Sequence, residues 1–180
     1  EGHTSRQNHT VRIANTDEGV IARLVEAGRK LFTLEARVAR ADGKCPSVEL
    51  SSKTLVEFLD YLGCGDRARN KRIPNSVLGS PRHMVLAFLE GLSLDSYIPS
   101  SIAKWAICLA SNGLLDDLQA VLTNLGIVHN RITKYNTEYD RSFDEVYAHG
   151  RQAQKFVSLL RFPEPHKQAR ASALRETNIG

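Results

Sequence analysis

The sequence predicts an α+β protein made of two copies of one βαββα unit. Residues 11–38 and 104–132 have the same order of short strand, polar break, amphipathic helix and second strand. Two further stretches, which begin near Ser47 and Asp144, each add a strand and a helix. The copies are roughly 95 residues apart, which is longer than solenoid repeats and indicates a pseudo-twofold pair. With 180 residues and 42% apolar content, the chain can bury a sizeable core.

The first copy occupies residues 1–79. A strand near Val11 precedes a helix for which either Thr16 or Asp17 is the expected N-cap. A second strand ends near Val38, and a third follows from Ser47. The last helix of this copy is expected from Ser52 to about residue 62, because Gly63 is a typical helix stop.

The second copy occupies residues 80–180 and begins with the most distinctive helix, residues 80–97. Ser80 is the expected N-cap and Pro81 suits the first turn. Gly91 lies where a missing side chain lets another helix backbone approach, so we expect helix–helix packing there. An apolar stripe at helical spacing supports this helix and consists of Val85, Leu86, Phe88, Leu89 and Leu92.

The remaining elements of the second copy mirror the first. A strand from Lys104 leads to a helix that Ser111 or Asn112 caps and that ends at Gly126. A further strand includes residues 130–132, and the closing helix runs from Gly150 to about residue 160.

Basic residues on the expected strands point to a polyanionic partner. The formal net charge is +4 and the isoelectric point is about 9.1, which favours nucleic acid only mildly. Their placement says more, because a sheet can turn its apolar side to the helices and its basic side outward. The alternative interpretation is that these basic residues are ordinary solvated strand residues, and the repeat argues against it. The candidates for DNA binding are Arg12, Arg37, Arg40, Arg72, Lys104, Arg131 and Lys134.

Residues 89–97 resemble the second signature helix of the LAGLIDADG homing endonucleases, and Glu1-Gly2 resembles the tail of the first. The block Lys71-Arg72-Ile73-Pro74, called the KRIP block below, resembles one that precedes the second helix in endonucleases carried inside inteins. The resemblance implies saddle-shaped antiparallel sheets in a monomer that binds double-stranded DNA. It also implies an intein splicing domain, which is not present in this chain and flanks it in cis.

The resemblance also implies the catalytic groups. Two signature helices end side by side in acids, where helix dipoles and carboxylates together attract a divalent cation. Glu1 and Asp95 are therefore the candidate metal ligands for Mg²⁺, with Mn²⁺ as a substitute. Lys71 and its counterpart Lys167 are expected to assist at the scissile phosphate.

One departure bears on activity. The second acid is expected at position 96, which is Ser96, and Asp95 lies one residue early. A shift of one residue on a regular helix rotates a side chain by roughly 100°. Either the last turn unwinds so that Asp95 reaches the metal, or the site is degenerate.

Two kinds of function remain open. The leading one is an intein-associated endonuclease that makes a site-specific double-strand break in the intein-free allele. The alternative is an inactive endonuclease domain, retained within an intein as a DNA-binding or purely structural module. Cys45, Cys64 and Cys108 lack metal-ligand or disulfide spacing, so we expect reduced, mostly buried thiols in a cytoplasmic protein. No apolar run approaches the length of a membrane span, so no membrane partner is expected.

Overall fold

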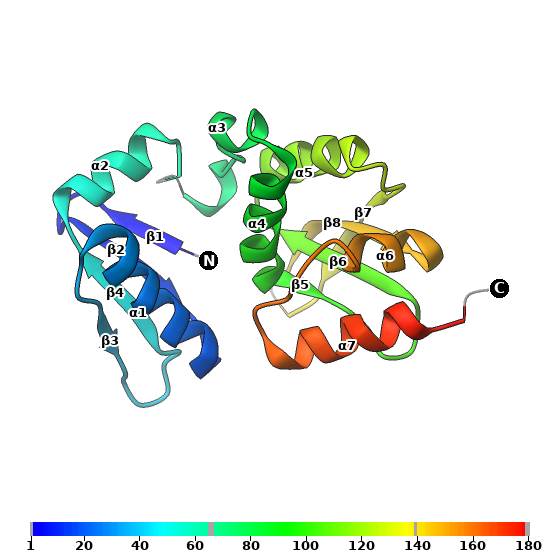
Figure 1. Ribbon diagram of the computed structural model, residues 1–180, viewed down its shortest axis with the longest axis horizontal. Coiled ribbons are helices and arrows are strands. Elements are labelled where there is room, and N and C mark those ends of the chain that lie inside the picture. Colours follow the sequence, from blue (N-terminus) through cyan, green and yellow to red (C-terminus); the bar gives the residue numbers. More distant parts are fainter. Residues whose placement is uncertain (1, 65–66, 139, 179–180) are drawn as a thin grey trace. The chain divides into compact units, whose positions relative to one another are not determined.

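The computed structural model describes residues 2–64, 67–138 and 140–178, and contacts divide the chain into two compact units, Glu1–Arg67 and Ala68–Gly180. Figure 1 shows the elements of both units. Each unit contains a four-stranded antiparallel sheet with helices against it, which confirms the predicted α+β class. The connection that carries the KRIP block packs with the second unit, although the second sequence copy begins at Ser80.

The first unit has a sheet in the order β1-β2-β4-β3. Its strands are β1 (Gly2–Ser5), β2 (Thr10–Ala14), β3 (Arg37–Ala39) and β4 (Ser47–Ser51). Helix α1 (Glu18–Phe32) starts after Asp17, whose carboxylate accepts the Val20 N–H at 3.0 Å. Helix α2 (Lys53–Tyr61) starts after Ser52, which caps it in the same way. Both expected helices are therefore present, and Asp17 is the cap of α1.

The second unit repeats this topology with the order β5-β6-β8-β7. Its strands are β5 (Ser96–Tyr97), β6 (Lys104–Leu109), β7 (Asn130–Asn136) and β8 (Arg141–His149). Helix α5 (Asn112–Asn124) starts after Ser111 and is followed by Gly126, which has a φ of +70°. The other elements are η1 (Ala68–Asn70), α3 (Asn75–Leu78), α4 (Arg82–Leu92), η2 (Ser93–Asp95), α6 (Gly150–Val157) and α7 (Pro165–Glu176).

The core of the second unit lies between its sheet and its helices. Trp105 on β6 is 2% exposed and meets Phe156 of α6 edge to face, with ring centroids 4.4 Å apart. Leu115, Leu118 and Leu122 of α5 are fully buried in the same cluster. The core of the first unit is much smaller and centres on Val11, Leu50, Leu55 and Val56.

Several expectations need correction. The unit is ββαββα, because the short strands β1 and β5 precede the elements read from the sequence. Helix α4 begins after Pro81, while the Ser80 hydroxyl donates to the Ser76 carbonyl at 2.6 Å. The distinctive helix also ends sooner than residue 97, because α4 stops at Leu92 and a 3₁₀ turn and β5 follow.

The cysteines differ from expectation as well. Cys45 and Cys108 are exposed and Cys64 is half-buried, so none of these three thiols lies in the core. Cys108 is exposed because it alternates with buried Ile107 on β6 and points to the other face of the sheet. Among the helices of the described residues, none has the length and apolar content that a membrane crossing requires.

Candidate functional site

Glu145 organises the face of the second sheet that points away from the helices. Its neighbour Val146 points into the core, so Glu145 points to the opposite face of β8. Lys104 of β6 donates to one carboxylate oxygen at 2.6 Å, and Lys134 of β7 donates to the other at 2.6 Å. The hydroxyl of Tyr97 on β5 donates to the same oxygen as Lys134. Glu145 therefore joins all four strands of the sheet.

This cluster keeps Glu145 ionised although the residue is only 1% exposed. Burial opposes the charged form, but hydrogen bonds from Lys104, Lys134 and Tyr97 outweigh it and lower the pKa of the carboxyl. The bond from Lys134 to Glu145 raises the pKa of the lysine despite partial desolvation. Lys104 also lies over the ring of Tyr147, 4.6 Å from its centroid.

The cluster separates the basic candidates of the second sheet. Lys104 is buried and pairs with Glu145, whereas the Lys134 side chain pairs with the same carboxylate but is 46% exposed to solvent. Arg131 lies on the opposite, helix-facing side of β7, so the outward basic side expected of this sheet does not include Arg131. Residues 131 and 134 differ by an odd number of positions on one strand, and period-two alternation separates them.

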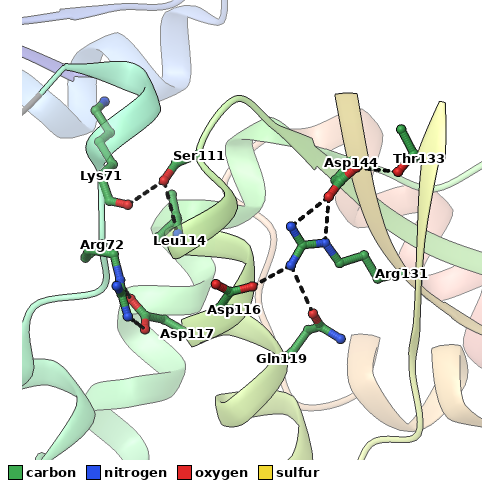
Figure 2. A network of polar contacts seen from close by, with 10 residues as sticks. All are labelled: Lys71, Arg72, Ser111, Leu114, Asp116, Asp117, Gln119, Arg131, Thr133 and Asp144. Atoms are coloured by element: carbon green, nitrogen blue, oxygen red, sulfur yellow. Dashed lines mark hydrogen bonds and ion pairs between the residues drawn. The ribbon is translucent and has the colours of Figure 1, made fainter. Parts of the chain in front are cut away.

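Arg131 belongs to a network that ties α5 to the sheet (Figure 2). Its guanidinium donates to Asp144 of β8 at 2.9 Å and to Asp116 of α5. Thr133 donates to the other oxygen of Asp144 at 2.7 Å. Hydrogen bonds from Thr133 and Arg131 lower the pKa of Asp144. This network is a contact within the second unit.

The first sheet presents a similar but more open face. Glu49 of β4 pairs with Arg12 of β2 at 2.8 Å and with Arg37 of β3 at 3.9 Å. Arg40 follows β3 and makes two bonds of 2.8 Å to Glu18, the first residue of α1. A hollow of about 470 Å³ adjoins these strands and is lined by Arg12, Ala14, Arg37, Val38, Ala39, Arg40, Ala41, Lys44, Cys45 and Ser47. Its basic side chains suit an anionic group, and the small residues Ala14, Ala39 and Ser47 leave room for one.

The KRIP block is fixed to the start of α5 (Figure 2). Arg72 donates to both carboxylate oxygens of Asp117, at 2.7 and 2.5 Å, and the Ile73 N–H donates to the same carboxylate at 2.9 Å. Ile73 is 2% exposed in the core. Ser111, the cap of α5, donates to the Lys71 carbonyl at 2.6 Å. The Arg72 charge is therefore engaged by Asp117, while the Lys71 side chain extends away from Ser111 and Asp117.

The ammonium of Lys167, on α7, lies at the end of the signature helix. It donates hydrogen bonds to the carbonyls of Ser93 and Leu94 at 3.3 and 2.5 Å. It also pairs with Glu164, three residues earlier in the chain. A cation at a helix C-terminus offsets the partial negative charge of the last carbonyls. Lys167 thus stabilises the turn that contains Asp95.

Asp95 is half-buried in η2. Next to it, Ser96 is 4% exposed and its hydroxyl donates to the Ser93 carbonyl at 2.7 Å. In residues 2–64, 67–138 and 140–178, no group of three or more His, Cys, Asp or Glu side chains is arranged to hold a metal ion. Glu1, the other candidate ligand, lies outside the described residues. Asp95 alone does not make a metal site.

Gly91 is exposed on α4, and apart from its own helix backbone and chain neighbours a Cβ there would meet no atom of the described residues within 4 Å. The stripe beside it packs inward: Leu89 is 2% exposed, and Val85, Leu86, Phe88 and Leu92 pack on the core of the second unit. Packing of a second helix at Gly91 stays a prediction.

The sequence reasoning missed the acids that hold these basic residues. Glu49, Asp117 and Glu145 each engage a basic candidate, and Tyr97 completes the cluster around Glu145. Strand alternation could have indicated Glu145. Because Val146 is apolar and faces the core, its neighbour Glu145 must lie on the opposite face of the strand, with the basic residues. No comparable signal links Arg72 to Asp117, 45 residues away.

Comparison with solved structures identifies proteins that share this fold. The chain resembles I-DmoI, solved in complex with DNA and Ca, with a TM-score of 0.66 and 16% identity over 98% of this chain and 90% of that one. It also resembles full-length DUF199/WhiA from Thermatoga maritima, with a TM-score of 0.62 and 11% identity over 99% and 57% of the two chains. Other I-DmoI complexes contain Mn or Mg. The chain therefore has the LAGLIDADG homing endonuclease fold.

Sequence relatives are segments of much longer proteins. Replication factor C small subunit of Methanocaldococcus jannaschii is 30% identical over 155 residues, which are 83% of this chain and 8% of that protein. A DNA polymerase of Thermococcus sp. (strain GE8) is 28% identical over 134 residues, which are 71% of this chain and 8% of that protein. No protein-family model matches the chain.

Proposed function

We propose that this chain is the DNA-binding and DNA-cutting domain of an intein, acting as a site-specific homing endonuclease. The single observation that carries the proposal is the fold, which the chain shares with I-DmoI over nearly its whole length. The basic strand residues support DNA as the partner, because Arg12, Arg37 and Lys134 keep exposed side chains on the sheet faces opposite the helices.

The sequence relatives support the intein setting. A replication factor and a DNA polymerase are different proteins by name, yet each contains a segment similar to this chain that makes up 8% of its length. A segment common to otherwise different proteins is expected of an inserted element. An intein is such an element, and its splicing domain would flank this chain in cis.

In this proposal Lys71 acts at the scissile phosphate as a point charge or proton relay. The ammonium of Lys167 donates to the carbonyls of Ser93 and Leu94, which supports a role in holding that turn, and its symmetric role at the phosphate stays a prediction. A divalent cation, Mg²⁺ with Mn²⁺ as a substitute, would need Glu1 beside Asp95. The described residues by themselves offer too few ligands to hold a metal.

A second candidate is a domain that binds DNA without cutting it. The observation that favours it is Ser96, which occupies the expected acid position and turns its hydroxyl to the Ser93 carbonyl. A serine so placed offers no negative charge to a metal.

Cleavage separates the two candidates. The full-length protein is incubated with a plasmid that carries the intein-free host gene, in Mg²⁺, Mn²⁺ or EDTA. Metal-dependent cutting at one site, abolished by Glu1→Gln or Asp95→Asn, is the result expected of the endonuclease. Folded protein that binds the plasmid without cutting it in either metal favours the second candidate. Folded protein with no salt-sensitive DNA binding overturns both.

A further inference from the structure

The carboxylate of Asp117 accepts hydrogen bonds from Arg72 and Ile73, the two residues that follow Lys71 in the chain. It accepts two N–H groups of Arg72 and the backbone N–H of Ile73, while its own side chain is only 9% exposed. The hydrogen bond from Arg72 is the largest cause of the lowered pKa of Asp117, and the Ile73 N–H adds to it against the cost of burial. Asp117 is therefore a charged, fully engaged anchor.

Helix α5 is shaped for this contact. A Cβ at Gly113 would lie 2.5 Å from Cδ of Arg72, so the arginine chain crosses the helix where only a hydrogen fits. Gly113 and Asp117 are four residues apart and share one face of α5. Arg72 thus lies along the first turns of the helix and ends on Asp117.

The backbone carbonyl of Lys71 is bound by the same helix. Ser111 donates to the Lys71 carbonyl at 2.6 Å, and its oxygen accepts the Leu114 N–H at 3.1 Å. One serine therefore caps α5 and fixes the backbone of Lys71. In Figure 2 both contacts lie on the backbone side of Lys71, and its ammonium extends the other way.

We propose that Asp117 and Ser111 are positioning residues that aim Lys71 at the DNA phosphate, and that Arg72 is part of this anchor. The proposal rests on the proposed function for the role of Lys71. A lysine ammonium sits on a flexible four-carbon stem, so its position is set first by where its backbone is held. Two hydrogen bonds join the backbone of residues 71 and 73 to α5 and so restrict the position from which the Lys71 side chain extends.

The first experiment measures how firmly residues 71–73 are held, and it does not depend on DNA cleavage. Amide hydrogen exchange is followed in the full-length protein with Asp117→Asn, and with Asp116→Asn as the matched control. Asp116 neighbours Asp117 on α5 but pairs with Arg131, which keeps its bond to Asp144. We expect faster exchange at residues 71–73 in the Asp117 variant only. Unchanged exchange there overturns the anchor, whether or not the protein cuts DNA.

The second experiment measures the catalytic consequence. Single-turnover cleavage rates and DNA affinity are compared for Asp117→Asn, Lys71→Met and the double variant. Misplacing a catalytic group by about 1 Å can cost up to about 100-fold in rate, so Asp117→Asn should slow cutting by about 10- to 100-fold, with a change in Kd for DNA no larger than that of Lys71→Met. Added to Lys71→Met, it should slow cutting by less than about twofold, because it acts through Lys71.

The outcomes separate the two proposals. Independent losses in the double variant, or an equal loss in Asp116→Asn, mean a general structural effect and overturn positioning. If the unmodified protein binds DNA without cutting, the same cycle is measured on the salt dependence of binding. Lys71→Met should then reduce the slope by about one ion, and Asp117→Asn should change that slope only when Lys71 is present. Arg72→Gln is the second variant, which releases the same anchor without altering α5.

Discussion

At the scale of single residues, Glu145 is the charge on which the second sheet most depends. Its carboxylate is the counter-ion of Lys104, whose side chain is only 10% exposed. Glu145→Ala leaves a buried ammonium without a partner, which typically costs about 3–5 kcal/mol. Urea unfolding of the variant measures this loss of stability.

Glu49→Ala is the matched control on the first sheet. Its partners Arg12 and Arg37 have side chains 54% and 81% exposed, so both remain hydrated when the acid is removed. We expect a loss below about 1 kcal/mol. Equal losses for the two variants would contradict the distinction between a buried and an exposed ion pair.

Acid should destabilise the second unit through the same residue. Hydrogen bonds from Lys104, Lys134 and Tyr97 overcome the effect of burial and hold the pKa of Glu145 below its ordinary value. A carboxyl with a lowered folded pKa contributes its stability above the unfolded pKa and loses it as pH falls through the folded pKa. Stability measured from neutral pH into the acid range should therefore fall less steeply in Glu145→Gln. A parallel curve for this variant would show that other carboxyls govern acid unfolding.

At the scale of elements, two helical glycines differ in what surrounds them. A Cβ at Gly28 of α1 would lie 2.6 Å from Cδ2 of Leu50, whereas a Cβ at Gly91 of α4 would meet no described residue outside its own helix turn within 4 Å. Gly28→Ala overpacks the contact between α1 and β4 and should cost about 1–3 kcal/mol.

Gly91→Ala should be neutral or stabilise this chain by up to about 1 kcal/mol, because alanine favours helix and nothing obstructs it. Thermal unfolding of both variants checks the pair. A large loss at Gly91 would show that a further helix packs there, as the sequence predicts.

The elements also show what the sequence could predict. Apolar spacing indicated α1, α2, α5 and α6, because these helices bury one face, and capping residues marked the starts of α1, α2 and α5. Strand β5 was missed since two residues give no alternation to read. Helix α7 was missed because its buried residues, Ala171 and Leu174, are too few to mark a face.

At the scale of the site, the sequence placed the basic residues on the correct strands but not their ion pairs. Charge alternation located Arg12, Arg37 and Lys134 on sheet faces. Which of these charges stays available depends on acids such as Glu145 that are distant in the chain, and packing brings them together.

At the scale of the whole molecule, the two units differ in charge and in core. The first contains 10 Lys and Arg and 10 Asp and Glu, whereas the second contains 14 and 10, so the second carries the net charge. The buried cluster of the second unit is also far larger. Domains near 60 residues bury the smallest fraction of their surface and are marginally stable.

We therefore expect residues 68–180 to fold alone and to bind double-stranded DNA in a salt-dependent way. Residues 1–67 alone should show weak, uncooperative unfolding. Circular dichroism melts of the two fragments, with DNA-binding anisotropy at two salt concentrations, check this. A cooperative melt of the first fragment, or an unfolded second fragment, would contradict it.

The end of α4 has an evolutionary consequence. Lys167 and Ser96 hold the carbonyls of that turn, and neither is a carboxylate. Because the fold is secured there by residues other than the expected metal ligand, selection for a correctly folded domain does not protect that ligand. If the domain cuts DNA as proposed, a lineage in which serine replaces an acid at position 96 loses a metal ligand, gains the bond to the Ser93 carbonyl and so passes on an intact domain.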